Sequence, residues 1–179
     1  RDGEADILIG TQMVTKGHDF PRVTLSGVLA ADISLNVPDF RAAERTFSLL
    51  TQVIGRAGRG DTPGRAIIHT ANPDNDVIRL ACAQDYESFY AREIQLRRLL
   101  VFPPFCDLAL LSLSCEDEKA LMLAARRLYE ETNKLIQGDY SDVKTVIFGP
   151  FEAPVYRVDN RFRMRMVVKC RLSKRTRAM

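Results

Sequence analysis

Residues 40–59 read FRAAERTFSLLTQVIGRAGR, and this stretch decides the fold of the N-terminal half of the chain. Between Phe40 and Ala57 the apolar residues recur at helical spacing, so we predict an amphipathic helix. Its apolar stripe consists of Phe47, Leu50, Val53 and Ile54. Its charged face carries Arg41, Glu44 and Arg45. Spaced ion pairs on a solvated surface are the simplest account of the charged face.

Three short apolar runs surround this helix, at residues 6–10 (DILIG), 24–31 (TLSGVLAA) and 65–70 (RAIIHT). We predict a strand for each, and burial of the first two on both faces. Strand, strand, helix and strand with short connections predict a parallel sheet covered by helices. The N-terminal half is therefore expected to be an incomplete α/β domain.

The C-terminal half begins after a turn-rich segment, NPDND at residues 72–76. We expect domains at residues 1–76 and 77–179, with a helix from about 86 to 100 that stops before the FPPF sequence of residues 102–105. Further on we predict a strand at 108–114, a helix at 117–136, and strands at 145–148 and 162–172. This order is typical of a small α+β domain with an antiparallel sheet and helices on one face.

Composition narrows the class of protein. Hydrophobic residues make up 46% of the 179 residues, which supports a packed core. No apolar run approaches the roughly 20 residues of a membrane helix, so we expect a cytoplasmic protein without a membrane partner. The scattered cysteines lack zinc or disulfide spacing and are expected to be reduced and mostly buried: Cys82, Cys106, Cys115 and Cys170. Both ends read as cut, so we expect a fragment.

The most basic segment lies near the C-terminus. Residues 157–177 contain nine Lys or Arg and one acid, Asp159, which favours an anionic partner. Within it, apolar and basic residues alternate as in a half-buried strand: Phe162, Met164, Met166, Val168 against Arg161, Arg163, Arg165, Lys169, Arg171. We expect this basic face to track a DNA backbone, and four neutralised phosphates would give a salt slope near −3 on single strands. The alternative is a sheet edge that uses charge to block aggregation.

A second candidate site lies at the end of the long helix. Arg56 and Arg59 follow Gln52, and two arginines three positions apart, across glycines, can point at one anion. The alternative is a basic helix end that offsets the helix dipole.

A loop rich in polar residues follows the DILIG run. Thr11 and Gln12 could bind a phosphodiester, Lys16 could add charge, and Asp19, after Gly17, could accept from a ribose or orient an arginine. The two histidines, His18 and His69, have no metal-ligand spacing, and His69 is expected to be structural.

Together the two segments resemble motifs V and VI of superfamily 2 helicases. The pattern is Thr11, then Gly17-x-Asp19, and one strand and one helix later Gln52-x-x-Gly-Arg56-x-Gly-Arg59. The resemblance implies the second RecA-like lobe, with Arg56 and Arg59 as arginine fingers on the γ-phosphate. It also implies nucleotide contacts for Gly17 and Asp19, and DNA contacts for Thr11, Gln12 and Lys16, with Gln52 and Asp19 linking nucleotide state to Thr11.

A closer resemblance is to the PriA family of replication-restart helicases. It is carried by DISLNVPDFRAAER at residues 32–45, by FPPF at 102–105, and by Ala153-Pro154 with the basic residues after it. It implies an ATP-dependent 3′–5′ DNA helicase that acts at forked and single-stranded DNA, with single-strand binding protein and primosome proteins as partners.

The chain also lacks parts of that family's pattern. It has no GxxxxGK[ST] phosphate loop, no acidic motif of the first lobe and no zinc-binding cysteine cluster. ATP and Mg²⁺ are therefore expected mainly on a first lobe, Zn²⁺ elsewhere in the parent protein, and no hydrolysis by the fragment alone. The alternatives are a non-enzymatic fork-binding or partner-docking module and another superfamily 2 translocase.

Overall fold

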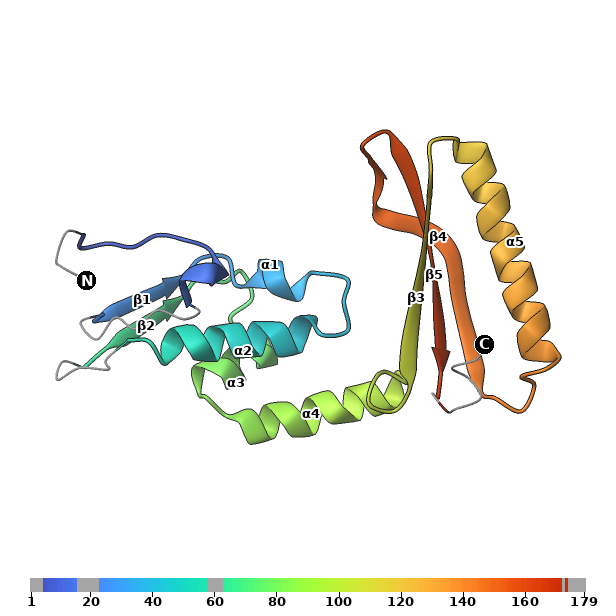
Figure 1. The fold of residues 1–179 in the computed structure, drawn as a ribbon. Coiled ribbons are helices and arrows are strands. Elements are labelled where there is room, and N and C mark those ends of the chain that lie inside the picture. The colour runs from blue at the N-terminus through green and yellow to red at the C-terminus, as the bar shows by residue number, and fades with distance from the viewer. Residues whose placement is uncertain (1–4, 16–22, 58–62, 172, 174–179) are drawn as a thin grey trace. The chain divides into compact units, whose positions relative to one another are not determined.

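The computed structural model describes residues 5–15, 23–57, 63–171 and 173, and the chain divides into two compact units (Figure 1). Unit 1 comprises residues 1–96 and unit 2 residues 97–179, and the division falls within one helix. The fold is mixed α/β, as expected, with one small parallel sheet and one antiparallel sheet.

The sheet of unit 1 consists of two parallel strands, β1 (Leu25–Val28) and β2 (Arg65–Ile68). The chain between them forms α1 (Asp32–Leu35) and α2 (Ala42–Ile54), and a 3-10 turn, η1 (Gln12–Thr15), precedes β1. The prediction of a long helix between two parallel strands is therefore confirmed. Burial of Phe47, Leu50 and Val53 confirms most of its apolar stripe.

The predicted strand at residues 6–10 is wrong, because these residues form no strand and pair with none in the described chain. Ile7 and Ile9 are 78% and 89% exposed. Burial of β1 on both faces is also wrong, since Leu25 is largely exposed. An apolar run becomes a buried strand only when neighbours satisfy its backbone and cover its side chains, and in the described part of unit 1 β1 pairs with β2 alone.

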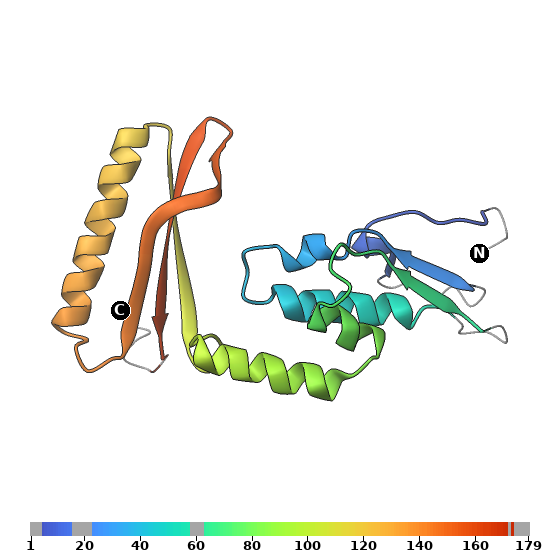
Figure 2. The ribbon, with the colours of Figure 1, turned by 180° about the vertical axis from the view of Figure 1, so that it is seen from behind.

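The core of unit 1 forms between α2, α3 (Asp76–Cys82) and α4 (Tyr86–Leu99). Figure 2 shows these helices from behind. The rings of Phe47 and Phe89 stack with centroids 4.2 Å apart, and Ile78 and Ala81 are buried beside them. Helix α4 confirms the helix predicted from about residue 86. Helices α1 and α3 were not predicted, and α3 begins at an Asn75 side chain that accepts from the amide of Val77. The domain boundary after residue 76 stays a prediction.

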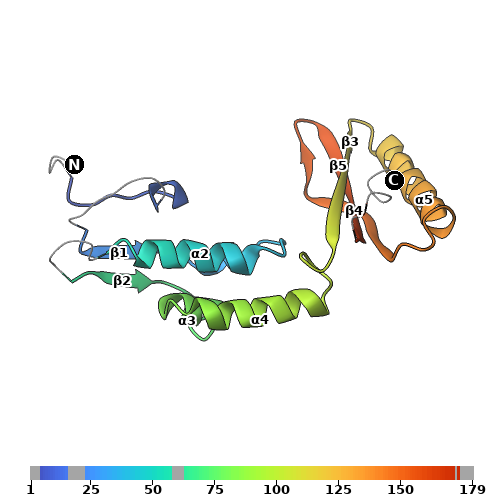
Figure 3. The same cartoon turned by 60° about the horizontal axis from the view of Figure 1, so that its bottom comes forward.

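Unit 2 contains a three-stranded antiparallel sheet in the order β3-β5-β4 (Figure 3). Its strands and its one long helix confirm the predicted α+β arrangement. Their bounds are β3 (Asp107–Cys115), α5 (Glu118–Gln137), β4 (Thr145–Val158) and β5 (Arg161–Cys170).

Helix α5 covers one face of this sheet. It begins at Asp117, whose carboxylate accepts from the amide of Ala120 at 3.0 Å. Leu121 and Ala125 pack from α5 onto Met164 of β5. Because the buried residues of β5 alternate along the strand, α5 protects one row of side chains and leaves the other row on the opposite face.

Strand β4 is longer than the predicted strand at 145–148. It continues into a hairpin whose two loop residues, Asp159 and Asn160, have φ of 49° and 62°. Two positive φ values in a two-residue loop are typical of a type I′ turn, which suits the twist of antiparallel strands. The register of β4 also shifts between Phe148 and Phe151, so the strand is irregular where the prediction stopped.

The cysteines are free thiols, but the expectation that they are mostly buried is wrong. Cys106 is buried, its thiol donates to the carbonyl of Val101 at 3.1 Å, and burial raises its pKa. Cys82 is exposed. Among the described residues no three metal-ligating side chains converge, and no described helix has the length and apolarity that crossing a membrane requires.

Candidate functional site

The predicted site residues fall in three places. Lys16, Gly17, Asp19 and Arg59 lie outside the described residues. Unit 1 holds Thr11, Gln12, Gln52 and Arg56, and strand β5 of unit 2 holds Arg161, Arg163, Arg165 and Lys169.

The first group begins at η1. The Thr11 hydroxyl accepts a long, 3.5 Å contact from the amide of Met13 and so caps this short turn. Turn η1 contacts α2, the helix that carries Gln52. Thr11, Gln12 and Gln52 are exposed and can meet a ligand. The fold thus brings the predicted backbone-binding segment alongside the helix that leads to the predicted arginines.

The end of α2 positions Arg56. Gly55 donates to the carbonyl of Thr51, and Arg56 donates to the carbonyl of Val53. Gly55 has φ −70°, so the sharp path expected from the glycine-rich sequence is not used at this position. Arg56 is half-buried just past the helix, where a cation also interacts favourably with the helix dipole. The dipole alternative therefore stays open for Arg56.

Because β1 and β2 pair in parallel, their first residues lie side by side. The amide of Arg65 donates to the carbonyl of Thr24 at 2.8 Å, immediately after the two undescribed stretches 16–22 and 58–62. At the other end of the strands, His69 Nδ1 accepts from the amide of Ala30, which has φ of 51°. The structural role expected for His69 is confirmed by this bond.

The alternation predicted for the basic strand is confirmed. Met164, Met166 and Val168 are buried toward α5, and the intervening basic residues lie on the other face. Strand β5 lies between β3 and β4, so it is the central strand. This position excludes the alternative in which the cations protect a sheet edge.

The four cations of β5 differ in their partners. Arg161 donates to the Ser114 carbonyl at 3.0 Å and pairs with Glu116. Lys169 donates to the Leu100 carbonyl at 3.1 Å. Across the described part of the chain, Arg163 and Arg165 make no side-chain hydrogen bond or ion pair, and Nε of Arg165 is buried without an acceptor.

Aromatic rings flank these cations, and sequence reasoning missed two of them. Phe148 and Phe151 of β4 lie opposite Val167 and Arg165 in the strand register. Lys169 Nζ lies 3.8 Å from the ring centroid of Phe102 and 5.1 Å from that of Phe148. Two residues three positions apart point to opposite faces of a regular strand. The shift in register between Phe148 and Phe151 brings both rings to the same face of the sheet. In the sequence, only the Gly149-Pro150 pair between them indicated such an irregularity.

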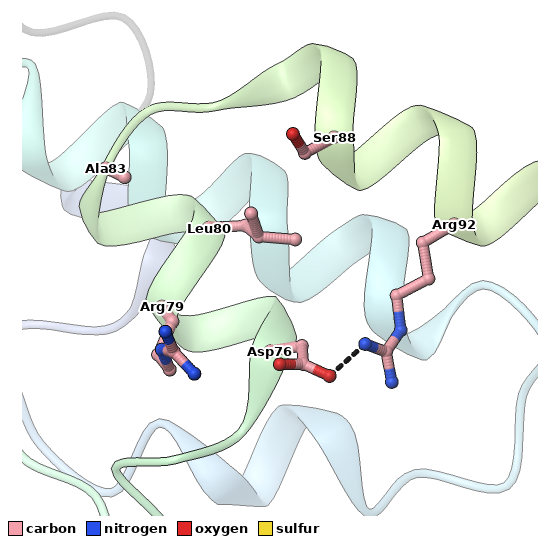
Figure 4. A pocket seen from close by; sticks show the side chains of 6 residues that line it. All are labelled: Asp76, Arg79, Leu80, Ala83, Ser88 and Arg92. Carbon is pink, nitrogen blue, oxygen red and sulfur yellow. Dashed lines mark hydrogen bonds and ion pairs between the residues drawn. The ribbon is translucent and has the colours of Figure 1, made fainter.

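A hollow lies between α3 and α4, and none of the predicted site residues lines it (Figure 4). Asp76 and Arg92 form an ion pair across it. Its lining consists of Asp76, Arg79, Leu80, Ala83, Ser88 and Arg92. Because Asp76 lines this hollow and already pairs with Arg92, the hollow suits an anion less well than the arginines of β5 do.

Comparison with known proteins finds one matching family and several similar proteins. Residues 98–179 match the family described as primosomal protein N C-terminal domain. The chain is 45% identical over 168 residues to the replication restart protein PriA of Bacillus subtilis, covering 94% of this chain and 20% of that protein. It is 42% identical over 168 residues to that of Synechocystis, covering 93% and 20%. For Rickettsia felis the identity is 40% over 174 residues, covering 95% and 27%.

The chain thus spans between a fifth and about a quarter of these relatives. The match includes the motif-bearing stretch of unit 1 as well as the basic strand of unit 2, since it covers nearly the whole chain. Residues 98–179 thus match the primosomal protein N C-terminal domain, and nearly the whole chain is similar to a part of the PriA replication restart proteins.

Proposed function

We propose that the chain is the C-terminal part of an ATP-dependent 3′–5′ DNA helicase that binds stalled replication forks and restarts replication by primosome assembly. The observation that carries this proposal is the 45% identity to a replication restart protein over 94% of the chain. The complete protein would work in the cytoplasm on forked and single-stranded DNA, with single-strand binding protein and primosome proteins as partners.

Unit 1 would supply the nucleotide-sensing half of the motor, as part of a second RecA-like lobe. Arg56 and Arg59 would stabilise charge on the transferred phosphoryl group, and Gln52 would respond to the nucleotide. Gly17 and Asp19 would contact the nucleotide. The contact between η1 and α2 supports a link from these residues to Thr11 and Gln12, which would bind the DNA backbone together with Lys16.

The cofactors fit this chain unequally. An exposed Gln52 and an Arg56 at a helix end suit a phosphate group, whereas the chain has no phosphate loop. ATP and Mg²⁺ would therefore be held mainly by a first lobe and would supply the phosphoryl group and its charge neutralisation. Zn²⁺ does not fit the described residues, which contain no cluster of ligands, and is proposed only for the parent protein.

Unit 2 would hold DNA through the free face of β5. Its cations Arg161, Arg163, Arg165 and Lys169 lie along one strand, and their spacing of about 6.6 Å between alternate residues suits a row of phosphates. The missing protein partners of Arg163 and Arg165 in the described chain support an external anion for these two. Arg161 and Lys169 would turn from their present partners or bind DNA in addition to them.

The motor proposal is tested by DNA-stimulated ATP hydrolysis in the complete protein, with Arg59→Ala and Arg56→Ala beside the unchanged protein. An arginine finger contributes about 10³- to 10⁵-fold in rate, so hydrolysis should collapse by that order. Binding to forked DNA, followed in the same samples, should persist.

The rival proposal is a non-enzymatic fork-binding or partner-docking module. It predicts that Arg59→Ala leaves the rate of ATP hydrolysis unchanged. Such a result would refute the hypothesis that residues 52–59 act in ATP hydrolysis. Arg126→Ala is a suitable control, because Arg126 lies on α5 and pairs with Glu130 on an exposed surface. It should change neither hydrolysis nor binding.

A further inference from the structure

The sheet of unit 2 has one face that no described helix of that unit covers (Figure 3). We define this open face by the strand register as the residues opposite the α5 side. They are Leu108, Leu110, Ser112 and Ser114 of β3, Val146, Phe148, Phe151 and Val158 of β4, and Arg161, Arg163, Arg165, Val167 and Lys169 of β5.

The open face carries apolar side chains that stay in water. Leu110 and Val146 are 55% and 51% exposed, and Phe148 and Phe151 are 46% and 42% exposed. Scattered apolar residues are ordinary on a protein surface, but a contiguous group on one sheet face marks a binding surface.

The charge of this face selects the occupant. Among its residues no carboxylate is present, and Arg163 and Arg165 flank the apolar group, while Arg161 at one end pairs with Glu116. Arg165 is partly exposed and makes no side-chain hydrogen bond or ion pair in the described chain, so the accessible part of its guanidinium can take a phosphate oxygen. The small side chains of Ser112 and Ser114 lie opposite the two arginines and leave them accessible from the β3 side. An anionic occupant with apolar parts fits this combination.

The backbone of β4 places both rings on this face. Phe148 lies opposite Val167 and Phe151 opposite Arg165, two residues apart on β5 and so about 6.6 Å apart along the strand. Gly149, with φ of 101°, makes the shift possible, because a Cβ there would lie 2.8 Å from the Phe151 ring and 2.9 Å from the Arg165 carbonyl. Two rings and two arginines thus occupy adjacent positions.

We propose that the open face binds unpaired bases of a single DNA strand, with Phe148 and Phe151 as the stacking platform and Arg163 and Arg165 on the phosphates. This rests on the proposed function and names the form of DNA that unit 2 takes. Bases stack on aromatic side chains regardless of their identity, while cations follow the backbone, so binding is insensitive to sequence. In a duplex the base faces are occupied by their neighbours, so the rings discriminate against paired DNA.

The chain contains no tryptophan, which permits a direct readout. Phe151→Trp introduces a single indole into the full 179-residue chain, and its fluorescence is titrated with an oligothymidylate of about 15 nucleotides and with a duplex of equal length. The single strand should quench the emission and saturate, and the duplex should bind more weakly with little quenching. Equal quenching by both would overturn the proposal.

A second variant removes one ring in the same background. Phe148→Leu should weaken single-strand affinity on the order of 10-fold and leave duplex affinity unchanged, while Phe148→Tyr should restore it. Leu123→Ala, an apolar change without a ring at a 70% exposed position of α5 outside the open face, is the control and should have no effect. Melting curves of each variant verify that the fold is retained.

The outcomes separate this inference from the proposed function. Should Phe148→Leu bind single strands normally while Arg163→Gln weakens every DNA, stacking is refuted and backbone binding stands. Should neither change affect any DNA, both the stacking and the backbone contact fail for this face.

Discussion

Gly149 lies at the register shift of β4 that places Phe148 and Phe151 on one face of the sheet. Its φ of 101° lies in the region that favours glycine, and an added Cβ would strike both the Phe151 ring and the backbone of Arg165. The Arg165 carbonyl cannot move freely, because it belongs to the backbone of the central strand. The irregularity of β4 thus depends on a residue without a side chain.

We predict that Gly149→Ala destabilises unit 2 by about 1–3 kcal/mol, the usual cost of holding an unfavourable backbone conformation. Urea unfolding measures the change. Gly27→Ala is the matched control, since an added Cβ in β1 meets nothing within 4 Å. Equal midpoints for Gly149→Ala and the unchanged chain would contradict the account of β4.

Asp32 ties α1 to the end of β2. Its carboxylate accepts from the Thr70 hydroxyl at 2.7 Å and from the Ala71 amide at 2.8 Å. These bonds, that of Thr70 foremost, lower the pKa of Asp32 below its ordinary value. A carboxylate with a lowered pKa in the folded state stabilises the protein above the unfolded pKa, and loses this effect as the pH falls through the folded one.

Asp32→Asn should therefore be less stable than the unchanged chain at pH 6, and the difference should narrow below about pH 4. Urea midpoints across this pH range provide the measurement. Asp74→Asn alters an exposed carboxylate of the turn before α3 and serves as the control. A difference that stays constant with pH would show that the Asp32 charge has no part in the effect.

At the scale of elements, the sequence predicted best those segments whose pattern is local. The stripe of Phe47, Leu50 and Val53 is sufficient to define α2, and the alternation of β5 is visible without knowing its neighbours. The DILIG run was misread because a strand requires a partner, and the described chain provides none. Likewise the basic face of β5 was predicted, but its rings were not, since Phe148 and Phe151 share it only through the irregularity of β4.

Helix α3 escaped prediction because seven residues hold little periodicity, yet its start has a clear physical cause. The Asn75 side chain accepts from the Val77 amide at 2.9 Å and so satisfies a donor that the helix leaves unpaired. Asn75→Ala should cost about 1 kcal/mol in the stability of unit 1, measured by urea unfolding. Asn72→Ala, three residues earlier in the same turn, is the control and should lower the stability of unit 1 less. Equal losses of stability in the two variants would argue against a capping role for Asn75.

At the scale of the whole molecule, the two units carry different parts of the proposed activity. Unit 1 contains the segments that resemble helicase motifs, and unit 2 contains the matched C-terminal domain with its basic strand. Sequence patterns located both parts but could not rank the cations of β5. The structure distinguishes Arg161 and Lys169, which have protein partners, from Arg163 and Arg165, which have none in the described chain.

The salt dependence of single-strand binding tests most directly the claim that β5 is a DNA-binding strand. Each neutralised phosphate contributes about 0.7 to the slope of log K against log salt, so Arg163→Gln with Arg165→Gln should flatten the slope by about 1.4. The control pair is Arg126→Gln with Lys134→Gln, which removes the same charge from exposed positions of α5. A slope of log K against log salt that becomes flatter only in the β5 variant confirms the claim. Identical slopes in the unchanged chain and the β5 variant would contradict it.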